Sequence, residues 1–386
     1  VTLASLGCIY LTRILGNTVS RVILKAPQSA DSDSNTRIGL LMAGSVPFLI
    51  YGTLVMFDFL VCACVLGALI FIVRYSESRS PKDLILIGLC AGIGILAKGP
   101  VALLYTLPVF LLAPFWATDF KRPAAWYGSV FLAILISAIP VLLWLIPVLQ
   151  AADNHFAFWL IWNQTAGRVT GNFSAAHVRP FYFYLPLLPL LVMPWVFFPT
   201  FWTGLKSLKS RFSDDRRLKF LACWFVPVFL AFSIIHGKQP HYLLPLLPAL
   251  VLLLTHMLSH VPLRRLAQVT ATMVAFFVVG QIVASETFFK RYDLQPFASI
   301  LEHKKEHHPL AYVSNYNAEF GFLAHVTEHI DDINKDDLDA WFVAHPDGLA
   351  IIRYTDESEV IAYKSLATMP YRGRNLGLFM IEKSNP

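Results

Sequence analysis

The sequence predicts an α-helical multi-span membrane protein of about ten transmembrane helices with a small C-terminal α/β domain. Hydrophobic residues make up 56% of the 386 residues and charged residues only 15%. The mean hydropathy is +0.57, and a soluble domain does not bury that much apolar surface. Long apolar runs continue to about residue 285, and the pattern then changes to short alternating runs.

Ten apolar runs, each near the length that crosses a bilayer core, form the predicted helical domain, residues 1–285. They are residues 1–16, 38–55, 57–74, 84–97, 101–116, 125–150, 181–202, 219–235, 241–258 and 268–285. Apolar side chains lie all round each run, which is typical of membrane spans. The runs 84–97 and 101–116 are short, so a re-entrant pair is an alternative for them. Segments 17–37 and 203–218 are predicted to be solvated connectors.

Basic residues are divided unequally between the two sets of alternate loops. One set carries sixteen Lys and Arg residues, and the other carries only Lys98, Arg168, Arg179 and Lys238. Cytoplasmic loops hold the excess of basic residues in membrane proteins, so the richer set is predicted to face the cytoplasm. The net charge of +6 therefore does not imply nucleic acid as a partner. An even number of spans places the C-terminal domain on the outer side.

Residues 286–386 form the predicted C-terminal domain. Short β-like runs alternate there with a charged helical stretch and a Pro-Asp-Gly turn, in LAYVSNYNAEFGFLAH and DDLDAWFVAHPDGLAIIRY. The five cysteines all lie in apolar runs of the helical domain. We interpret them as small hydrophobic residues, and neither disulfides nor a cysteine metal site is expected.

Two charged residues stand at the ends of predicted spans on the outer side. Asp58 opens a span after LIYGTLVMF, and Lys98 lies between two apolar runs. A charge at the edge of the hydrocarbon is costly, so both are candidates for function, Asp58 as a carboxylate in the reaction and Lys98 as a clamp on a phosphate. The alternatives are an interfacial Asp58 that caps its helix and a Lys98 that extends to the membrane surface.

The longest outer loop, residues 155–186, combines aromatic and basic residues. Its front half is rich in Phe and Trp, and Arg168, His177 and Arg179 then precede the aromatic start of the next span. Aromatic belts are ordinary at membrane interfaces, so the aromatic residues alone indicate little. Arg and His beside Tyr hydroxyls at a lipid surface suit an anionic lipid headgroup.

The outer turn HGKQPHY, residues 236–242, concentrates polar groups between two apolar helices. Lys238, His241 and Tyr242 in this turn favour binding of a phosphate or pyrophosphate. A metal ion is a weaker alternative, because His-x4-His is not a strong metal spacing and no Cys or carboxylate lies nearby in the sequence. A polar turn at the membrane surface is the remaining interpretation. With Asp58, Lys98 and the long loop, the turn predicts one outer site for a lipid phosphate whose chain lies in the bilayer.

Three stretches carry a family resemblance: AGIGILAKGPVALL, HVRPFYFYLPLLPLLVMPW and HGKQPHYLLPLLPALVLLL. In order and spacing they resemble bacterial polyprenyl-phosphate-dependent glycosyltransferases of the GT-C superfamily, across about residues 1–285. The group that they resemble comprises the lipid A aminoarabinose transferase and its dolichyl-phosphate-mannose protein mannosyltransferase relatives. Each stretch is moderately specific by itself, and the three together are a strong signal.

The resemblance implies an enzyme that moves a sugar from a polyprenyl-phosphate donor to a lipid, glycolipid or protein acceptor at the periplasmic face of the bacterial inner membrane. Family members use an Asp of an Asp-Glu pair in the first outer loop as base or to orient the acceptor. The first helix of this chain resembles the family's second. The resemblance therefore implies that the chain is N-terminally truncated, without that loop, and leaves its activity open.

The resemblance also assigns roles to individual residues. Asp58 matches the second outer acidic position, which orients the acceptor or the sugar, and Lys98 matches the Lys of Lys-Gly-Pro-Val. His177 precedes the Pro-Phe-x-x-Tyr segment and is implied to help hold a divalent metal ion, the one cofactor that the resemblance suggests.

Further positions of the family pattern bear on the lipid phosphate. Lys238, His241 and Tyr242 match the Lys-x-Pro-His-Tyr turn and are implied to lie at the phosphate of the donor. Arg168 and Arg179 join them as candidate phosphate ligands, although relatives vary at the position of Arg179. Lys and Arg there would neutralise the charge that develops on the leaving phosphate.

Two other functions compete with a glycosyltransferase. A transporter or flippase for lipid-linked sugars is disfavoured, because its charges would lie at mid-membrane and its sequence would often show repeats, whereas here the charges gather at one face without a visible repeat. A non-catalytic subunit that binds lipid-linked sugars is the third hypothesis. An Asp-Glu loop encoded upstream would argue against it.

Overall fold

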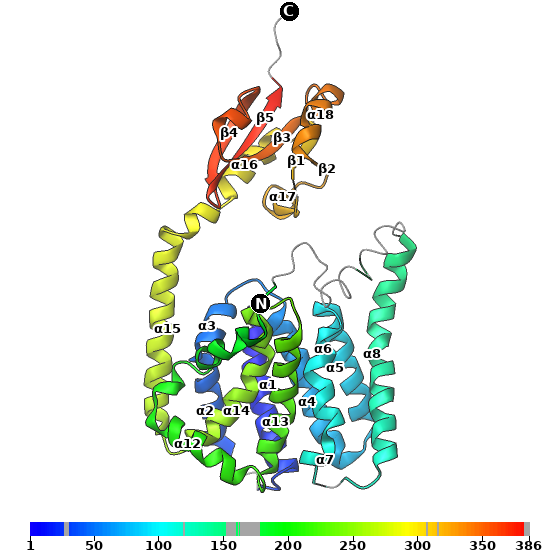
Figure 1. Cartoon of the computed structure of the whole chain (residues 1–386), viewed down its shortest axis with the longest axis vertical. Helices are drawn as coiled ribbons and strands as arrows, with labels where there is room; N and C mark the ends of the chain where they lie inside the picture. Colours follow the sequence, from blue (N-terminus) through cyan, green and yellow to red (C-terminus); the bar gives the residue numbers. More distant parts are fainter. Residues whose placement is uncertain are drawn as a thin grey trace, which may run out of the picture. The chain divides into compact units, whose positions relative to one another are not determined.

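The computed structural model describes residues 1–26, 31–118, 120–151, 160, 162, 178–305, 308–314 and 316–381. Two compact units divide the chain, Val1–Phe277 and Val278–Pro386. The first unit is helical and the second is built on a β-sheet (Figure 1). Each unit has hydrophobic core residues of its own, in one cluster for the first and two clusters for the second.

The described part of the helical unit consists of α-helices, some of only four residues, and short 3-10 helices. Its α-helices are α1 (Thr2–Val22), α2 (Asp31–Ala43), α3 (Val46–Tyr51), α4 (Asp58–Ser78), α5 (Pro81–Lys98), α6 (Val101–Leu111), α7 (Ala113–Trp116), α8 (Pro123–Ala151), α11 (Leu188–Leu191), α12 (Pro199–Arg211), α13 (Arg216–Ile234), α14 (Leu247–Met257) and α15 (Leu263–Glu286). Its 3-10 helices are η3 (Phe181–Leu187), η4 (Trp195–Phe197) and η5 (Pro240–Leu246).

Among the described residues, five helical segments are long and apolar enough to cross a membrane. They are α4, α8, α13, the η5–α14 segment and α15. The chain is therefore a helical membrane protein, as its composition predicts. Helix α4 lies deepest among these five, since 72% of its most apolar window is buried inside the protein.

Glycines let α5 approach its neighbour α8 closely. A Cβ atom on Gly92 would lie 2.5 Å from the carbonyl oxygen of Ser137, and one on Gly88 would lie 2.9 Å from that of Ala133. Both partners belong to α8, and the Gly-x-x-x-Gly spacing puts the two glycines on one face of α5. On its other side α5 packs against α4. This packing fixes the position of the end of α5, where Lys98 lies.

The structure corrects the predicted run 181–202, which is not one helix. It is divided into η3, α11, η4 and the start of α12. Prolines at positions 186, 189, 194 and 199 explain the division, because proline lacks the amide hydrogen that continues an α-helix. The run 38–55 is likewise divided, between α2 and α3, where Pro47 lies in the first turn of α3.

Segment 203–218, predicted to be a solvated connector, is largely exposed, but most of it is helical and not a loop. Helix α12 begins at Pro199, a favourable first position for proline, and continues to Arg211. Its sequence PTFWTGLKSLKSR buries Phe201 and exposes Trp202, Leu205 and Lys206. Helix propensity and one buried side chain therefore outweigh the polar composition that suggested a loop.

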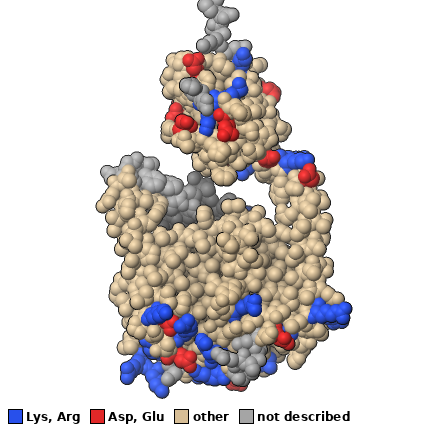
Figure 2. All heavy atoms as spheres, turned by 180° about the vertical axis from the view of Figure 1, so that it is seen from behind, with Lys and Arg blue, Asp and Glu red and all other residues tan. Residues whose placement is uncertain are grey.

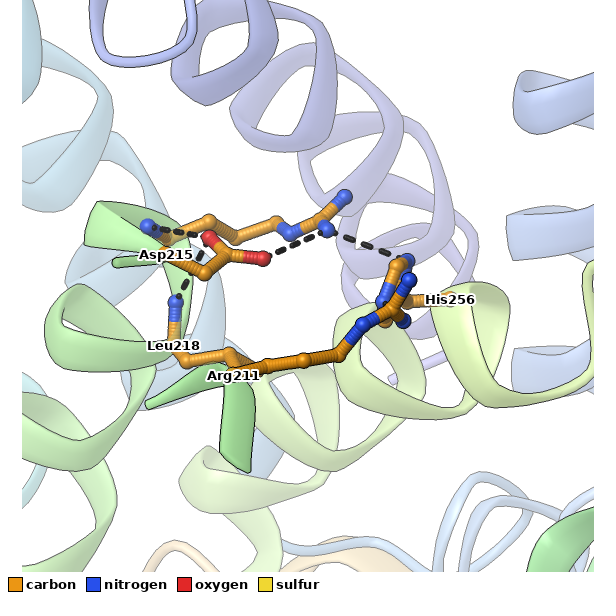
Figure 3. Close-up of polar contacts among 5 residues, drawn as sticks. Arg211, Asp215, Leu218 and His256 are labelled. Carbon is orange, nitrogen blue, oxygen red and sulfur yellow. Dashed lines mark hydrogen bonds and ion pairs between the residues drawn. The ribbon is translucent and has the colours of Figure 1, made fainter. Parts of the chain in front are cut away.

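Basic side chains gather at one end of the helical unit, the end at which α7 and α12 lie (Figures 1 and 2). Figure 3 shows a polar cluster from α12, α13 and α14 there. Guanidinium nitrogens of Arg211 and Arg217 lie 2.6 and 3.0 Å from the two ring nitrogens of His256. Asp215 caps α13 by accepting from the main-chain N–H groups of Arg217 and Leu218. These contacts join the ends of three helices.

The charge of Asp215 is maintained by its partners. Burial by itself would raise the pKa of this carboxyl. The Arg217 guanidinium, 2.9 Å away, and the two main-chain N–H groups more than offset this effect, so the pKa lies below its ordinary value. The carboxylate thus compensates one of the arginines that crowd His256.

The second unit is a mixed five-stranded sheet with helices on both faces. Its strands are β1 (Leu310–Val313), β2 (Ile330–Ile333), β3 (Leu349–Tyr354), β4 (Tyr363–Tyr371) and β5 (Arg374–Ile381). Its helices after α15 are η6 (Phe289–Tyr292), α16 (Gln295–Lys304), α17 (Glu319–Leu323), η7 (Lys335–Asp337), α18 (Leu338–Ala344) and η8 (Glu357–Glu359). The order β2-β1-β3-β5-β4 has parallel β1–β2 and β1–β3 pairs and antiparallel β3–β5 and β4–β5 pairs.

Alternate residues of the central strands supply two separate cores. Leu310 and Tyr312 of β1 pack in one cluster with Phe297 of α16. Ala311 and Val313 pack in the other cluster, which contains the α18 helix residues Leu338, Trp341 and Phe342. The two-residue period of a β-strand accounts for this division, and it explains why β1 reads as a continuous apolar run.

Candidate functional site

Asp58 and Lys98 lie at the same end of two packed helices. Asp58 is the first residue of α4 and Lys98 is the last residue of α5. The chain turns there through Gly99, whose φ of +84° is in the region that favours glycine, and enters α6. Because α6 leads to α7, this turn lies at the end of the helical unit away from α7 and α12 (Figure 1).

The two side chains form an ion pair. The Lys98 ammonium nitrogen lies 2.5 Å from Oδ1 of Asp58. The Asp58 side chain is only 4% exposed, whereas that of Lys98 is 24% exposed. A nearly buried carboxylate requires such a partner, since an isolated buried charge is very costly. The ammonium is therefore held in place and still partly accessible.

Tyr242 from η5 covers the ion pair. Its ring centroid lies 4.9 Å from the Lys98 ammonium, a distance at which a cation is attracted to the face of an aromatic ring. The ring centroids of His241 and Tyr242 lie 4.9 Å apart in an edge-on arrangement. The ring centroid of Tyr51 lies 6.2 Å from that of His241. The structure thus brings together four of the residues singled out in the sequence, namely Asp58, Lys98, His241 and Tyr242.

Buried tyrosines hold the 236–242 turn from below. The hydroxyl of Tyr105 in α6 donates to the carbonyl of Tyr242 at 2.6 Å, and that of Tyr184 in η3 donates to the carbonyl of Gln239 at 3.1 Å. Tyr105 was not singled out from the sequence, and Tyr184 was noted only as part of the aromatic start of the next span. A tyrosine within an apolar run was the available signal, because a buried phenol needs a hydrogen-bond acceptor.

Lys238 and Arg179 join two segments of the chain. The Lys238 ammonium donates to the carbonyl oxygens of Arg179, at 3.0 Å, and of Ile235. The Arg179 N–H donates to the His236 carbonyl at 3.2 Å, and Val178 pairs with Gly237 in an isolated β-bridge. Lys238 is 2% exposed, and burial lowers the pKa of its ammonium. Both hydrogen bonds found for Lys238 go to main-chain oxygens, so this buried lysine holds the turn in place.

The guanidinium of Arg179 lies 5.6 Å from the centre of the Phe183 ring. The other two candidates from the long outer loop, Arg168 and His177, lie outside the described residues. Within the described part of the chain, no group of three or more His, Cys, Asp or Glu side chains is placed to hold a metal ion. The proposed metal role of His177 stays a prediction.

The arrangement is suited to binding an oxyanion. It combines a fixed cation, a carboxylate that orients the cation, and aromatic rings at the end of a helical bundle. A preorganised cation stabilises negative charge that develops in a reaction without further reorganisation.

Comparison with known proteins supports the resemblance. Residues 26–144 match the family model described as dolichyl-phosphate-mannose-protein mannosyltransferase. The chain is 30% identical over 267 residues to undecaprenyl phosphate-alpha-4-amino-4-deoxy-L-arabinose arabinosyl transferase 2 of Proteus mirabilis, a match that covers 66% of this chain and 44% of the relative. It is 37% identical over 174 residues to the corresponding transferase of Photorhabdus laumondii, covering 44% of this chain and 30% of the relative. The chain thus spans less than half the length of these curated relatives.

Solved structures show the fold. The crystal structure of ArnT from Cupriavidus metallidurans in the apo state matches 98% of this chain and 82% of its own, with a TM-score of 0.71 and 15% identity. The same protein bound to undecaprenyl phosphate matches 100% of this chain and 84% of its own, with a TM-score of 0.65 and 14% identity. The chain has an ArnT-like fold, and its resemblance to the aminoarabinose transferase and protein mannosyltransferase group is confirmed.

Proposed function

We propose that this ArnT-like chain takes part in transferring an aminopentose from an undecaprenyl-phosphate donor to a glycolipid acceptor, lipid A. Its relatives' names specify the donor and the sugar. The observation that carries the proposal is the Asp58–Lys98 ion pair beside Tyr242, in a chain with the fold of a protein crystallised with undecaprenyl phosphate. About ten spans, in the bacterial inner membrane, would place this pair at the periplasmic face.

Each residue of the pair has a role in the proposed reaction. The bond between the anomeric carbon and a phosphate oxygen breaks, and its electron pair stays on the phosphate. Lys98 neutralises that charge, and Asp58 both holds Lys98 and orients the acceptor. The acceptor oxygen gives its proton to a base and forms the new bond to the anomeric carbon. Arg179, His241 and Tyr242 are the proposed ligands of the phosphate, and Lys238 holds the 236–242 turn. Arg168, outside the described residues, stays a predicted phosphate ligand.

A transfer assay with the full chain in lipid nanodiscs tests the proposal. The chain is incubated with undecaprenyl-phosphate aminoarabinose and lipid A, and mass spectrometry reports lipid A that has gained one aminopentose. Lys98→Met should lower the rate by roughly 10²–10³, the usual effect of removing a charge-stabilising donor. Lys82→Met is the matched control, because Lys82 is an exposed lysine near the opposite end of the same helix.

Two results would contradict the proposal. One is a wild-type chain that binds the donor lipid and transfers no sugar, which would favour a binding subunit. The other is equal transfer by the wild type and the Lys98→Met variant, which would remove Lys98 from the reaction.

A further inference from the structure

A cavity of about 470 Å³ lies in the second unit, well apart in sequence from the site described above. Its volume is within the range of small-molecule sites. The residues around it include Arg291, Thr355, Tyr371, Gly373, Arg374 and Asn375. They come from η6, from the end of β3 and from the hairpin of β4 and β5. All of them lie within the second unit.

A tight turn builds one wall of this cavity. Arg372 and Gly373 connect β4 to β5 with φ angles of +50° and +75°, the signs of a type I′ hairpin turn. The N–H of Arg372 donates to the carbonyl of Arg291 at 3.1 Å, which fixes the turn to η6. The Arg372 guanidinium also lies 5.0 Å from the centre of the Tyr371 ring and 5.9 Å from that of Tyr292. These contacts hold the β4–β5 turn against η6, on the two sides of the cavity.

The cavity is cationic. Arg291 and Arg374 line it, and no carboxylate does. Among the residues that the structure describes, neither arginine forms an ion pair. The carboxylate of Glu359 faces the adjoining segment, but it accepts from the main-chain N–H groups of Thr355 and Asp356 and pairs with Lys335. Within the described residues, Glu359 is therefore engaged elsewhere, and Arg291 and Arg374 have no carboxylate in ion-pair contact.

The lining residues select a class of ligand. The planar fork of arginine suits the bidentate recognition of a phosphate, and two such groups suit a doubly charged one. Asn375, Thr355 and Tyr371 offer neutral amide and hydroxyl groups of the kind that bind sugar hydroxyls. We propose that this cavity binds a sugar that carries a phosphate monoester. The ligand is either a free sugar phosphate or the phosphorylated headgroup of a glycolipid.

Calorimetry on the full chain in nanodiscs tests this proposal with glucosamine 1-phosphate as the probe. Glucosamine without phosphate and inorganic phosphate serve as comparison ligands. The phosphate ester should bind best, because it uses both the arginines and the neutral groups. The double variant Arg291→Gln/Arg374→Gln should bind it at least about tenfold more weakly, since glutamine lacks the charge that strengthens hydrogen bonds to phosphate.

Lys364→Gln is the matched control. Lys364 is an exposed cation near the other end of β4, so its loss lowers the net charge without changing the cavity. Equal binding by the wild type and the double arginine variant would overturn the proposal. An equal loss on Lys364→Gln would also overturn it, because it would indicate attraction by net charge alone.

A competition experiment shows whether the ligand is a free sugar phosphate or a glycolipid headgroup. Nanodiscs that contain a phosphorylated glycolipid should compete with glucosamine 1-phosphate if the headgroup is the natural ligand, and should leave its affinity unchanged if a free sugar phosphate is. The glycosyl-transfer proposal fails separately, since Lys98→Met should leave this binding unchanged. Loss of binding in the double arginine variant thus supports the cavity whether or not the chain transfers sugar.

Discussion

The ammonium nitrogen of Lys98 lies 2.5 Å from Oδ1 of Asp58, although forty residues separate the two in the chain. Their exposure is unequal, at 24% for the Lys98 side chain and 4% for that of Asp58. The carboxylate is therefore the partner that depends on the pair. Removal of one member of a buried ion pair leaves an uncompensated charge, which costs far more than removal of both.

This asymmetry predicts different stabilities for three variants. Lys98→Met leaves a nearly buried carboxylate without its cation and should destabilise the protein by up to about 3–5 kcal/mol. Asp58→Asn leaves a partly exposed ammonium and should cost less. The double variant Asp58→Asn/Lys98→Met should recover most of the lost stability while transfer stays low. Thermal unfolding in nanodiscs measures the first effect and the transfer assay the second.

The comparison separates a structural role from a catalytic one. If the double variant recovered transfer together with stability, the pair would serve the fold alone. If Asp58→Asn destabilised the protein more than Lys98→Met, the difference in burial would not govern the energetics.

Because α5 and α8 approach closely, a single glycine substitution between them should lower the stability of the protein strongly. A side chain on Gly92 would meet the Ser137 carbonyl at 2.5 Å, so Gly92→Leu should separate the helices and destabilise the protein by about 1–3 kcal/mol or more. The shift should reach Lys98 at the end of α5 and lower transfer. Gly128→Leu in α8 is the matched control, because nothing lies within 4 Å of a Cβ there.

Thermal unfolding of Gly92→Leu and Gly128→Leu measures whether the α5–α8 contact is tight. Equal melting temperatures would show that the α5–α8 contact is not tight, and the packing account of the position of Lys98 would then fail.

Much of the helical fold was predictable, because a long apolar run without polar breaks has few alternatives to a buried or membrane helix. The run 219–235 matches α13 (Arg216–Ile234), and the run 125–150 matches α8 (Pro123–Ala151). Residues 181–202 are an exception, because this apolar run does not form one helix. Hydropathy sums over side chains, whereas the prolines act on main-chain hydrogen bonds, so an apolar run can be broken without any change in its hydropathy.

Four of the residues that the structure brings together, Asp58, Lys98, His241 and Tyr242, could be singled out from the sequence, but their pairings could not. Asp58 and Lys98 were singled out because each is a charge at the edge of an apolar run, but only tertiary packing joins them. Lys238 shows the converse. A lysine in a polar turn suggested a phosphate ligand, and the hydrogen bonds found for it go to main-chain oxygens. Long side chains have many reachable partners, so sequence position alone does not select one.

The contacts of Lys238 predict a structural phenotype. Lys238→Met leaves the carbonyl oxygens of Arg179 and Ile235 without this donor. Both hydrogen bonds are only partly buried, so the loss should cost no more than about 1–3 kcal/mol, the penalty for a buried unsatisfied group. The variant should therefore unfold at lower temperature and expose the 236–242 turn to proteolysis. His236→Ala is the control, because its exposed side chain lies in the same turn.

Binding of the donor lipid by the Lys238→Met variant would show whether this structural interpretation is wrong. A variant with unchanged stability and weaker binding of undecaprenyl phosphate would show that Lys238 contacts the phosphate directly, as the family pattern implies.

Glu359 predicts an acid-sensitive second unit. The ion pair with Lys335 and the main-chain N–H groups of Asp356 and Thr355 lower the pKa of Glu359 to about 2. A carboxyl whose pKa is lower in the folded state stabilises fully above its unfolded pKa, about 4.3, and this contribution is lost as the pH falls towards 2. The melting temperature of the wild type should therefore fall over this interval, and that of Glu359→Gln should fall less. Asp336→Asn, beside Lys335, should retain the wild-type slope.

The N-terminus of α13 offers the last test, because two interactions of Asp215 can be separated. Asp215→Ala removes both the N-cap and the ion pair with Arg217, and it should cost about 0.5–2 kcal/mol. Asp215→Asn keeps an oxygen for the cap and loses only the charge, so it should cost less and should lose its difference from the wild type in high salt. Chemical denaturation at two salt concentrations measures both effects. Asp214→Ala, the exposed neighbour, should be neutral. If Asp215→Asn were as unstable as Asp215→Ala, the compensation of the arginines around His256 would outweigh the cap.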